Sequence, residues 1–245
     1  MEMEESLGYP IVFICPTRKR PHNVKRLIES FLNKAEKLSN IQFYFYVDSD
    51  DLETQSLIGN IQEDNKRNII NFVVGERIIM CEMSNILARM APRDSLLFFC
   101  GDDVVCNTLG WDTIVRTIFL NLPKDKIALL FGDDGINGPK LATHFFVHKN
   151  WIDALGHMTP SIFTGDWADN WVSSTASRIG RMYYNEKLKL THMHPTIGKA
   201  EFDDTYIEKY QRDRLSKPMN FFNKHADLWL EDVEKLEEFI RNYND

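Results

Sequence analysis

From the N-terminus to residue 131, segments with the apolar pattern of a strand alternate with segments that have the apolar pattern of a helix. Short apolar runs bounded by turn residues predict buried strands, and apolar residues three or four positions apart predict helices. The expected strands span residues 11–15, 41–47, 69–74, 95–100 and 127–131. Helical spacing falls between them over residues 24–35, 52–62, 83–90 and 111–122, with Asn23 a candidate N-cap. This order predicts an α/β fold with a mostly parallel sheet flanked by helices.

The second half of the chain departs from this regular alternation. Residues 144–148 and 183–190 are further strand candidates, and either is compatible with an antiparallel strand, while residues 166–179 indicate a helix. A polar loop follows Pro195, and residues 229–243 predict a long amphipathic helix. We expect residues 1–200 to form one domain and residues 201–245 to be a C-terminal loop and helix packed on it. The sequence pattern does not determine the oligomeric state.

The composition is typical of a folded globular protein, and the net charge weighs against nucleic acid or anionic lipid as a partner. Apolar residues make up 43% of the 245 positions, charged residues 27% and aromatic residues 12%. The formal charge is -7, from 36 acidic and 29 basic residues, so the overall field does not attract nucleic acid or anionic lipid. Basic residues still cluster over residues 18–26 and 178–199, which is compatible with a local basic patch.

The cysteines and the N-terminus predict the compartment. Cys15, Cys81, Cys100 and Cys106 form no CxxC pair, and we interpret them as reduced thiols. The N-terminal residues MEMEESLGYP lack the basic and apolar regions of a signal peptide, and no apolar run reaches membrane-spanning length. We therefore expect a cytoplasmic protein without integral membrane association.

Three polar clusters follow predicted strands directly. They are residues 16–20, 48–51 and 101–103. In open α/β sheets, ligands bind beyond the carboxyl ends of the strands, where such loops converge. Asp102 and Asp103 are adjacent carboxylates, which a divalent cation would allow to remain ionised together, and oxygen ligands favour Mg²⁺ or Mn²⁺. The alternative is a turn with two solvated aspartates.

Polar residues further along the chain favour the metal interpretation. Asp166 and Asp169 lie near the start of a predicted helix, and His192 and His194 follow a predicted strand. Histidine is a good ligand for Mn²⁺, and we expect one of these two histidines to reach the ion. The acidic loop at Asp48 is suited to hydrogen-bonding a base or a ribose.

The order of these motifs resembles the GT-A glycosyltransferases, in particular inverting, family-two-like enzymes, with phage-type members among the candidates. The resemblance covers residues 10–195. It is carried by PTRKRP after the first strand, YVDSDD after the second, FFCGDDV at the position of the DXD motif, GDWADNWVSSTASRIG and THMHP. One departure is that Gly101 stands at the first position of the DXD motif.

The resemblance implies a role for each site residue. Pro16, Thr17 and Arg18 would contact the nucleotide, and Asp48 and Asp50 the uracil or ribose. Asp102 would make the ribose or sugar contact that the residue at the first position of the DXD motif usually makes. Arg18 or Lys199 would add positive charge beside the diphosphate. Mn²⁺ or Mg²⁺ would be bound by Asp103 together with His192 or His194. The general base would be Asp169, which the spacing to Gly180 favours, or Asp166, which the helix start favours.

The implied activity is metal-dependent, inverting transfer of a hexosyl or pentosyl group from a UDP-sugar to an acceptor hydroxyl. The acceptor would be a saccharide or a hydroxymethylated DNA base, and for a phage-encoded enzyme the compartment would be the host cytoplasm. One alternative is a non-catalytic protein that binds a nucleotide sugar or carbohydrate. A nucleotidyltransferase is disfavoured because PTRKRPH has no glycine for a phosphate loop.

Overall fold

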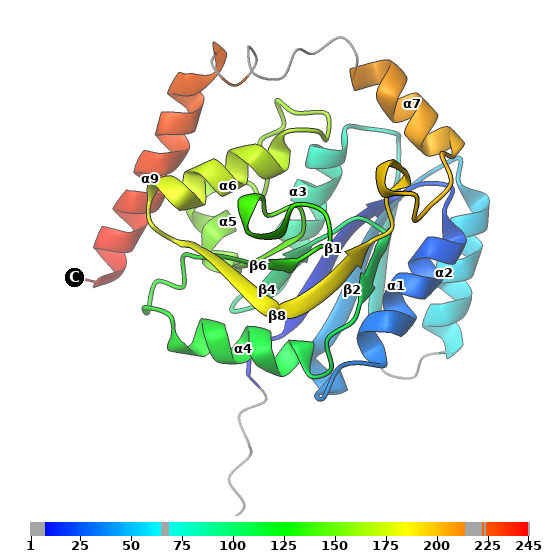
Figure 1. Cartoon of the computed structure of the whole chain (residues 1–245), viewed down its shortest axis with the longest axis horizontal. Helices are drawn as coiled ribbons and strands as arrows, with labels where there is room; N and C mark the ends of the chain where they lie inside the picture. The colour runs from blue at the N-terminus through cyan, green and yellow to red at the C-terminus, as the bar shows by residue number, and fades with distance from the viewer. Residues whose placement is uncertain (1–7, 65–68, 214–221, 223, 245) are drawn as a thin grey trace, which may run out of the picture.

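The computed structural model describes residues 8–64, 69–213, 222 and 224–244, so the acidic N-terminal residues 1–7 lie outside it. Over these residues a single sheet has the strand order β3-β2-β1-β4-β7-β6-β8-β5 (Figure 1). The strands are β1 (Ile11–Thr17), β2 (Ile41–Asp48), β3 (Ile70–Gly75), β4 (Leu96–Phe99), β5 (Val104–Cys106), β6 (Leu129–Asp133), β7 (Phe145–His148) and β8 (Met182–His192).

The structure contains the predicted helices and two that the sequence did not predict, at residues 149–155 and 204–213. The described helices are α1 (Pro21–Leu32), α2 (Leu52–Asp64), α3 (Met80–Met90), α4 (Trp111–Asn121), α5 (Lys149–Leu155), α6 (Ala168–Arg178), α7 (Asp204–Asp213) and α9 (Ala226–Asn244). Helix α1 begins at Pro21, not after Asn23, so the predicted N-cap is wrong. Proline has the fixed backbone angle and the missing N–H that suit the first position of a helix.

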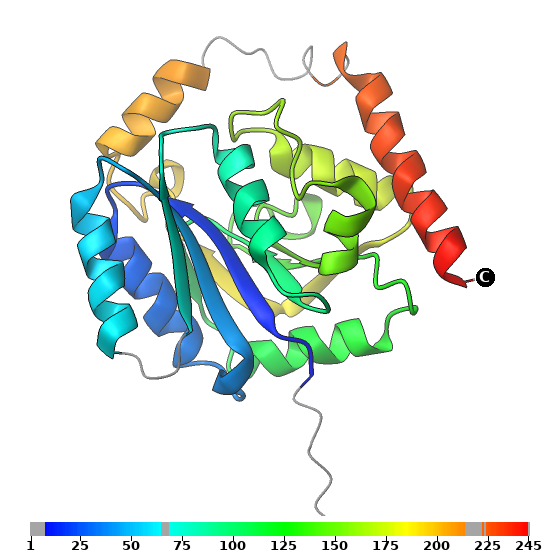
Figure 2. The same cartoon turned by 180° about the vertical axis from the view of Figure 1, so that it is seen from behind.

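Helices cover both faces of the sheet, which explains why its central strands are apolar at nearly every position. Successive side chains of a strand point to opposite faces, so Phe13 belongs to an apolar cluster with residues of α1, α2 and α4, whereas Ile14 belongs to one with residues of α3, α5, α6 and α9. Figures 1 and 2 show the two groups of helices on the two sides of the sheet. The predicted α/β fold is confirmed.

Most strand pairs are parallel, and one strand reverses the direction in the middle of the sheet. Strands β1, β2, β3 and β4 run parallel to one another, and β6 runs parallel to β8. Strand β7 is antiparallel to both β4 and β6, and the short strand β5 is antiparallel to β8. The first residues of β7 therefore lie at the same edge as the carboxyl ends of β1, β2 and β4.

The C-terminal helix α9 packs against α5 and α6 through a buried polar contact as well as apolar side chains. Asp232 accepts a hydrogen bond from the indole N–H of Trp171 at 2.9 Å, and it pairs with Nε2 of His157 at 3.2 Å. Trp171 is 2% exposed, so it contributes to the core.

Replacing Asp232 with alanine is expected to destabilise the protein, because the buried indole N–H of Trp171 loses its acceptor. The expected loss is about 1–3 kcal/mol of unfolding free energy, measured by denaturant titration. The matched control is Glu234→Ala, an exposed position on the same helix. An equal effect of the two variants would contradict the proposed role of Asp232.

None of the described helices combines the length and apolar character that a membrane crossing needs. The four cysteines all fall among the described residues, where they are buried and form no disulfide.

Candidate active site

A cavity of about 400 Å³ opens at the carboxyl edge of the parallel strands. Because β1, β2 and β4 run in the same direction, the loops that follow them converge there. Most residues predicted for the site line this cavity, namely Pro16, Thr17, Arg18, Asp48, Asp102, Asp103, Asp166, Asp169, His192 and His194. Asp50 and Lys199 are exposed and lie outside its lining.

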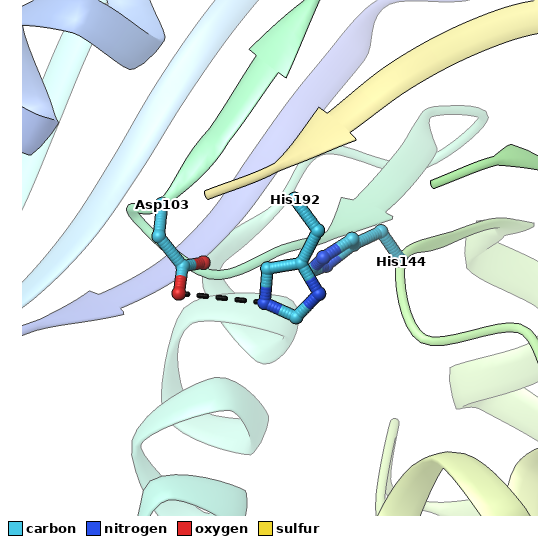
Figure 3. A group of neighbouring side chains, drawn as sticks. All are labelled: Asp103, His144 and His192. Atoms are coloured by element: carbon cyan, nitrogen blue, oxygen red, sulfur yellow. Dashed lines mark ion pairs between the residues drawn. The ribbon is translucent and has the colours of Figure 1, made fainter. Parts of the chain in front are cut away.

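Asp103, His144 and His192 form a buried cluster in this cavity (Figure 3). Each offers one potential ligand atom, and these atoms all lie within 4.8 Å of one another. The distance from Oδ2 of Asp103 to Nε2 of His192 is 3.4 Å, and the two imidazole rings are 4.6 Å apart between centroids. One carboxylate oxygen and two imidazole nitrogens are suited to a divalent transition metal.

Backbone contacts hold Asp103 and His192 together although they come from distant parts of the chain. Strand β5, which follows Asp103, pairs with the end of β8 so that Val104 lies opposite His192. The N–H of Met193 donates to the carbonyl of Asp103 at 2.7 Å, and the N–H of His192 donates to the carbonyl of Asp134 at 3.1 Å. The cluster is thus built on the sheet itself.

Gly101 leaves space for the carboxylate of Asp103. A Cβ atom at position 101 would lie 2.5 Å from Oδ1 of Asp103, which is closer than real Cβ atoms approach other atoms. An aspartate at this position, as in a DXD motif, would displace the Asp103 side chain. The glycine in the GDD sequence is therefore part of the geometry of the cluster.

The histidines of the cluster have unused hydrogen-bonding capacity. Within the described part of the chain, neither ring nitrogen of His144 has a hydrogen-bond partner, and Nδ1 of His192 has none. Burial lowers the pKa of His144 to about 3, so its ring is neutral and available to a metal ion at neutral pH. Burial alone would raise the pKa of Asp103, but its contacts with His192 outweigh this effect and lower the pKa, so Asp103 is ionised.

His194 lies beside the cluster without joining it. Its ring centroid is 5.0 Å from that of His192, and its Nδ1 accepts a hydrogen bond from the backbone N–H of Thr196 at 3.3 Å. That contact caps the short 3-10 helix Pro195–Ile197. The sequence left His192 and His194 as alternative metal ligands, and the geometry favours His192.

Arg18 connects the loop after β1 to the acidic loop after β2. Its guanidinium donates to Asp48 at 2.7 Å and to both oxygens of Asp50 at 2.5 and 2.9 Å. The Asp48 side chain is 1% exposed, and its Oδ1 has no hydrogen-bond partner among the described residues. Burial raises the pKa of Asp48 despite the contact with Arg18. Asp48 also lines the cavity, so this buried oxygen is a candidate acceptor for a ligand N–H or O–H.

Asp102 anchors the loop that follows β1. Its two oxygens accept hydrogen bonds from Thr17 Oγ1 at 2.7 Å and from Asn23 Nδ2 at 3.1 Å, and Arg20 Nη1 lies 3.5 Å away. Burial raises the pKa of Asp102 to about 6. Because both oxygens contact the chain itself, this carboxylate fixes the position of the loop on the end of β4.

Helix α7 adds a residue that the sequence did not predict for the site. Tyr206 donates a hydrogen bond from its hydroxyl to Oδ2 of Asp103 at 2.6 Å. Burial, followed by the charge of Asp103, raises the pKa of Tyr206, so the hydroxyl remains a donor. The guanidinium of Arg20 lies 4.2 Å above the Tyr206 ring and forms two hydrogen bonds with Asp203.

Asp166, Trp167 and Asp169 come from the start of α6 and line another part of the cavity. Asp166 is exposed, whereas Asp169 is half-buried in the first turn of the helix. Trp167 between them has a φ of 74°, a left-handed backbone conformation that is uncommon for a residue other than glycine. Such conformations cluster at ligand sites, where surrounding structure enforces them.

No known protein-family profile matches the chain, and no curated protein matches it in sequence. Among solved structures it is similar to the mannosyltransferase PcManGT from Pyrobaculum calidifontis in complex with GDP-Man and Mn²⁺, with 14% identity and a TM-score of 0.62. That match covers 78% of this chain and 58% of the mannosyltransferase. It is also similar to TarS from S. aureus, with 11% identity and a TM-score of 0.54, over 72% of this chain and 35% of TarS. The chain has the GT-A fold that the sequence motifs predicted.

Proposed function

We propose that this protein is a metal-dependent glycosyltransferase that moves a sugar from a UDP-sugar to an acceptor hydroxyl with inversion at the anomeric carbon. The observation that carries the proposal is the buried cluster of Asp103, His144 and His192 in the cavity of a GT-A fold. The similar mannosyltransferase, of which this chain spans 58%, was determined with a nucleotide sugar and Mn²⁺.

The residues present fit a divalent cation. The unpartnered buried nitrogens of His144 and His192 and the ionised carboxylate of Asp103 would hold it. Two imidazole ligands favour Mn²⁺ over Mg²⁺, which prefers an all-oxygen set. When bound, the cation supplies positive charge that stabilises the departing diphosphate.

Asp48 is the proposed contact for the donor base. Only its Oδ1 lacks a partner among the described residues, since Oδ2 accepts from Arg18. An unpartnered carboxylate oxygen in the cavity lining can accept the ring N–H of uracil. We therefore propose UDP as the nucleotide and Arg18 as the group that holds Asp48 in place.

Asp169 is the proposed general base, with Asp166 beside it on the acceptor side of the cavity. The carboxylate of Asp169 removes the proton of the acceptor hydroxyl as its oxygen bonds to the anomeric carbon. The bond between that carbon and the phosphate oxygen breaks, and its electron pair leaves with UDP. Asp169 is favoured over the exposed Asp166 because the first turn of α6 fixes its position.

A saccharide is the proposed acceptor, in preference to a hydroxymethylated DNA base. The three arginines that line the cavity each contact carboxylates of the chain: Arg18 contacts Asp48, Arg20 contacts Asp203, and Arg77 contacts Glu208. Contacts with nucleic acid phosphates require available cations. Trp167 offers a flat apolar surface on which a sugar ring could stack.

The activity is tested by measuring UDP release from a panel of UDP-sugars, with oligosaccharides and hydroxymethylated DNA as acceptors. We expect release with a saccharide to stop in EDTA and to return when Mn²⁺ is added. Modification of the DNA alone would overturn the proposed acceptor. Binding of UDP-sugar without hydrolysis or transfer to any acceptor would favour the non-catalytic alternative.

Replacing Gly101 with alanine is expected to weaken Mn²⁺ binding because the new methyl group displaces the Asp103 carboxylate. The expected loss is about 10- to 100-fold in affinity, as for other residues that orient metal ligands. Isothermal titration with MnCl₂ measures it, with Gly59→Ala as the control since a Cβ there meets nothing within 4 Å. Unchanged affinity in Gly101→Ala would show that Asp103 does not depend on this glycine.

A further inference from the structure

Helix α7 (Figure 1) is attached to the loops of the proposed donor site by several side-chain contacts. Asp203, just before the helix, forms two hydrogen bonds with Arg20 at 2.7 and 2.6 Å. Thr205 donates from its hydroxyl to the carbonyl of Arg18 at 3.2 Å, and Glu208 pairs with Arg77 at 2.5 Å. These contacts join α7 to the loops that follow β1 and β3.

The position of α7 on these loops also brings the hydroxyl of Tyr206 to the cluster of Asp103, His144 and His192. Its hydrogen bond goes to Oδ2 of Asp103, the oxygen that also lies 3.4 Å from His192. The Tyr206 ring contacts the guanidinium of Arg20, 4.2 Å from its centroid, and the ring of His194, whose centroid is 5.1 Å away. Tyr206 is 6% exposed, so the position of its hydroxyl follows that of α7.

We propose that Tyr206 is a positioning residue for the Asp103 carboxylate, so that docking of α7 and binding of the divalent cation strengthen one another. This inference rests on the proposed function because it requires the metal site. Through the hydrogen bond from Tyr206 to Asp103, the C-terminal segment completes that site.

Tyr206 supports the metal ligand and does not compete with the cation. A carboxylate oxygen has two lone pairs, so Asp103 can accept the tyrosine hydrogen bond and still coordinate a cation. Carboxylates that bind metals are themselves commonly oriented by hydrogen bonds of this kind. Coupling between two events is reciprocal, so a cation that gains affinity from docked α7 must also stabilise that docking.

The test compares Mn²⁺ binding by the wild-type protein and the Tyr206→Phe variant, using isothermal titration calorimetry on the full chain. We expect about tenfold weaker binding in the variant, in the range found when orienting residues are removed. Tyr243→Phe, at a 48% exposed position on α9, is the matched control and should bind Mn²⁺ like the wild type. Hydrogen exchange of residues 204–213 should slow when Mn²⁺ is added to the wild type, and less so in Tyr206→Phe.

The outcomes separate the inference from the proposed function. Equal or tighter binding by Tyr206→Phe overturns the positioning role, as does faster or unchanged exchange of α7 in Mn²⁺. Absence of Mn²⁺ binding by the wild-type protein overturns the proposed metal site, and the inference with it. A loss of thermal stability in Tyr206→Phe with unchanged Mn²⁺ affinity indicates a structural role only and also contradicts the inference.

Discussion

Replacing Asp169 with asparagine is expected to lower the rate of sugar transfer by about two to four orders of magnitude, the usual contribution of a general base. The amide has nearly the same shape as the carboxylate but cannot accept the proton of the acceptor hydroxyl. In the proposed site the donor contacts Asp48 and the metal cluster, not Asp169, so the KM for the UDP-sugar should change little while kcat falls. Steady-state kinetics with a saturating acceptor measure both quantities.

Asp166→Asn is the matched variant for this experiment, since it changes the exposed carboxylate just before the same helix. A smaller effect in Asp166→Asn than in Asp169→Asn is expected. The reverse order would transfer the role of general base to Asp166. Full activity in the double variant would contradict base catalysis by either residue.

Replacing His144 with alanine is expected to reduce Mn²⁺ affinity by at least about 100-fold, more than the 10- to 100-fold typical of residues that only orient ligands. The reason is that His144 offers a buried, neutral imidazole in contact with His192 and close to Asp103. Transfer activity at micromolar Mn²⁺ should fall together with the Mn²⁺ affinity. Electron paramagnetic resonance of free Mn²⁺ measures the affinity directly.

His194→Ala distinguishes the two histidines that the sequence left as alternatives. Since His194 caps the helix after β8 and lies outside the cluster, this variant should largely retain Mn²⁺ affinity. Retention of wild-type affinity by His144→Ala, with loss in His194→Ala, would contradict the assignment of the cluster.

The sequence predicted the fold well where local patterns decide it. Apolar runs such as residues 41–47 are buried on both faces of the sheet, and helical spacing such as that of residues 111–122 gives α4. It did not predict β5 because three residues carry too little periodicity. Nor did it predict α7, whose residues 204–213 are mostly polar and whose contacts lie far away along the chain.

The candidate site could be predicted only in part for a similar reason. Polar residues at or just after the ends of the parallel strands, such as Arg18, Asp48 and Asp103, converge because strand direction places them together. His144 precedes a strand, and only the reversed direction of β7 brings it to the same edge. Tyr206 reaches Asp103 across 103 positions of sequence, a pairing that no local pattern encodes.

The central claim is that Asp103, His144 and His192 bind the divalent cation that holds the donor diphosphate. It is tested most directly by anomalous diffraction from a crystal of the protein grown with UDP and MnCl₂. The account predicts one manganese peak coordinated by these three side chains and by the diphosphate, with the uracil at Asp48. A manganese peak elsewhere, or UDP bound away from this cavity, would contradict it.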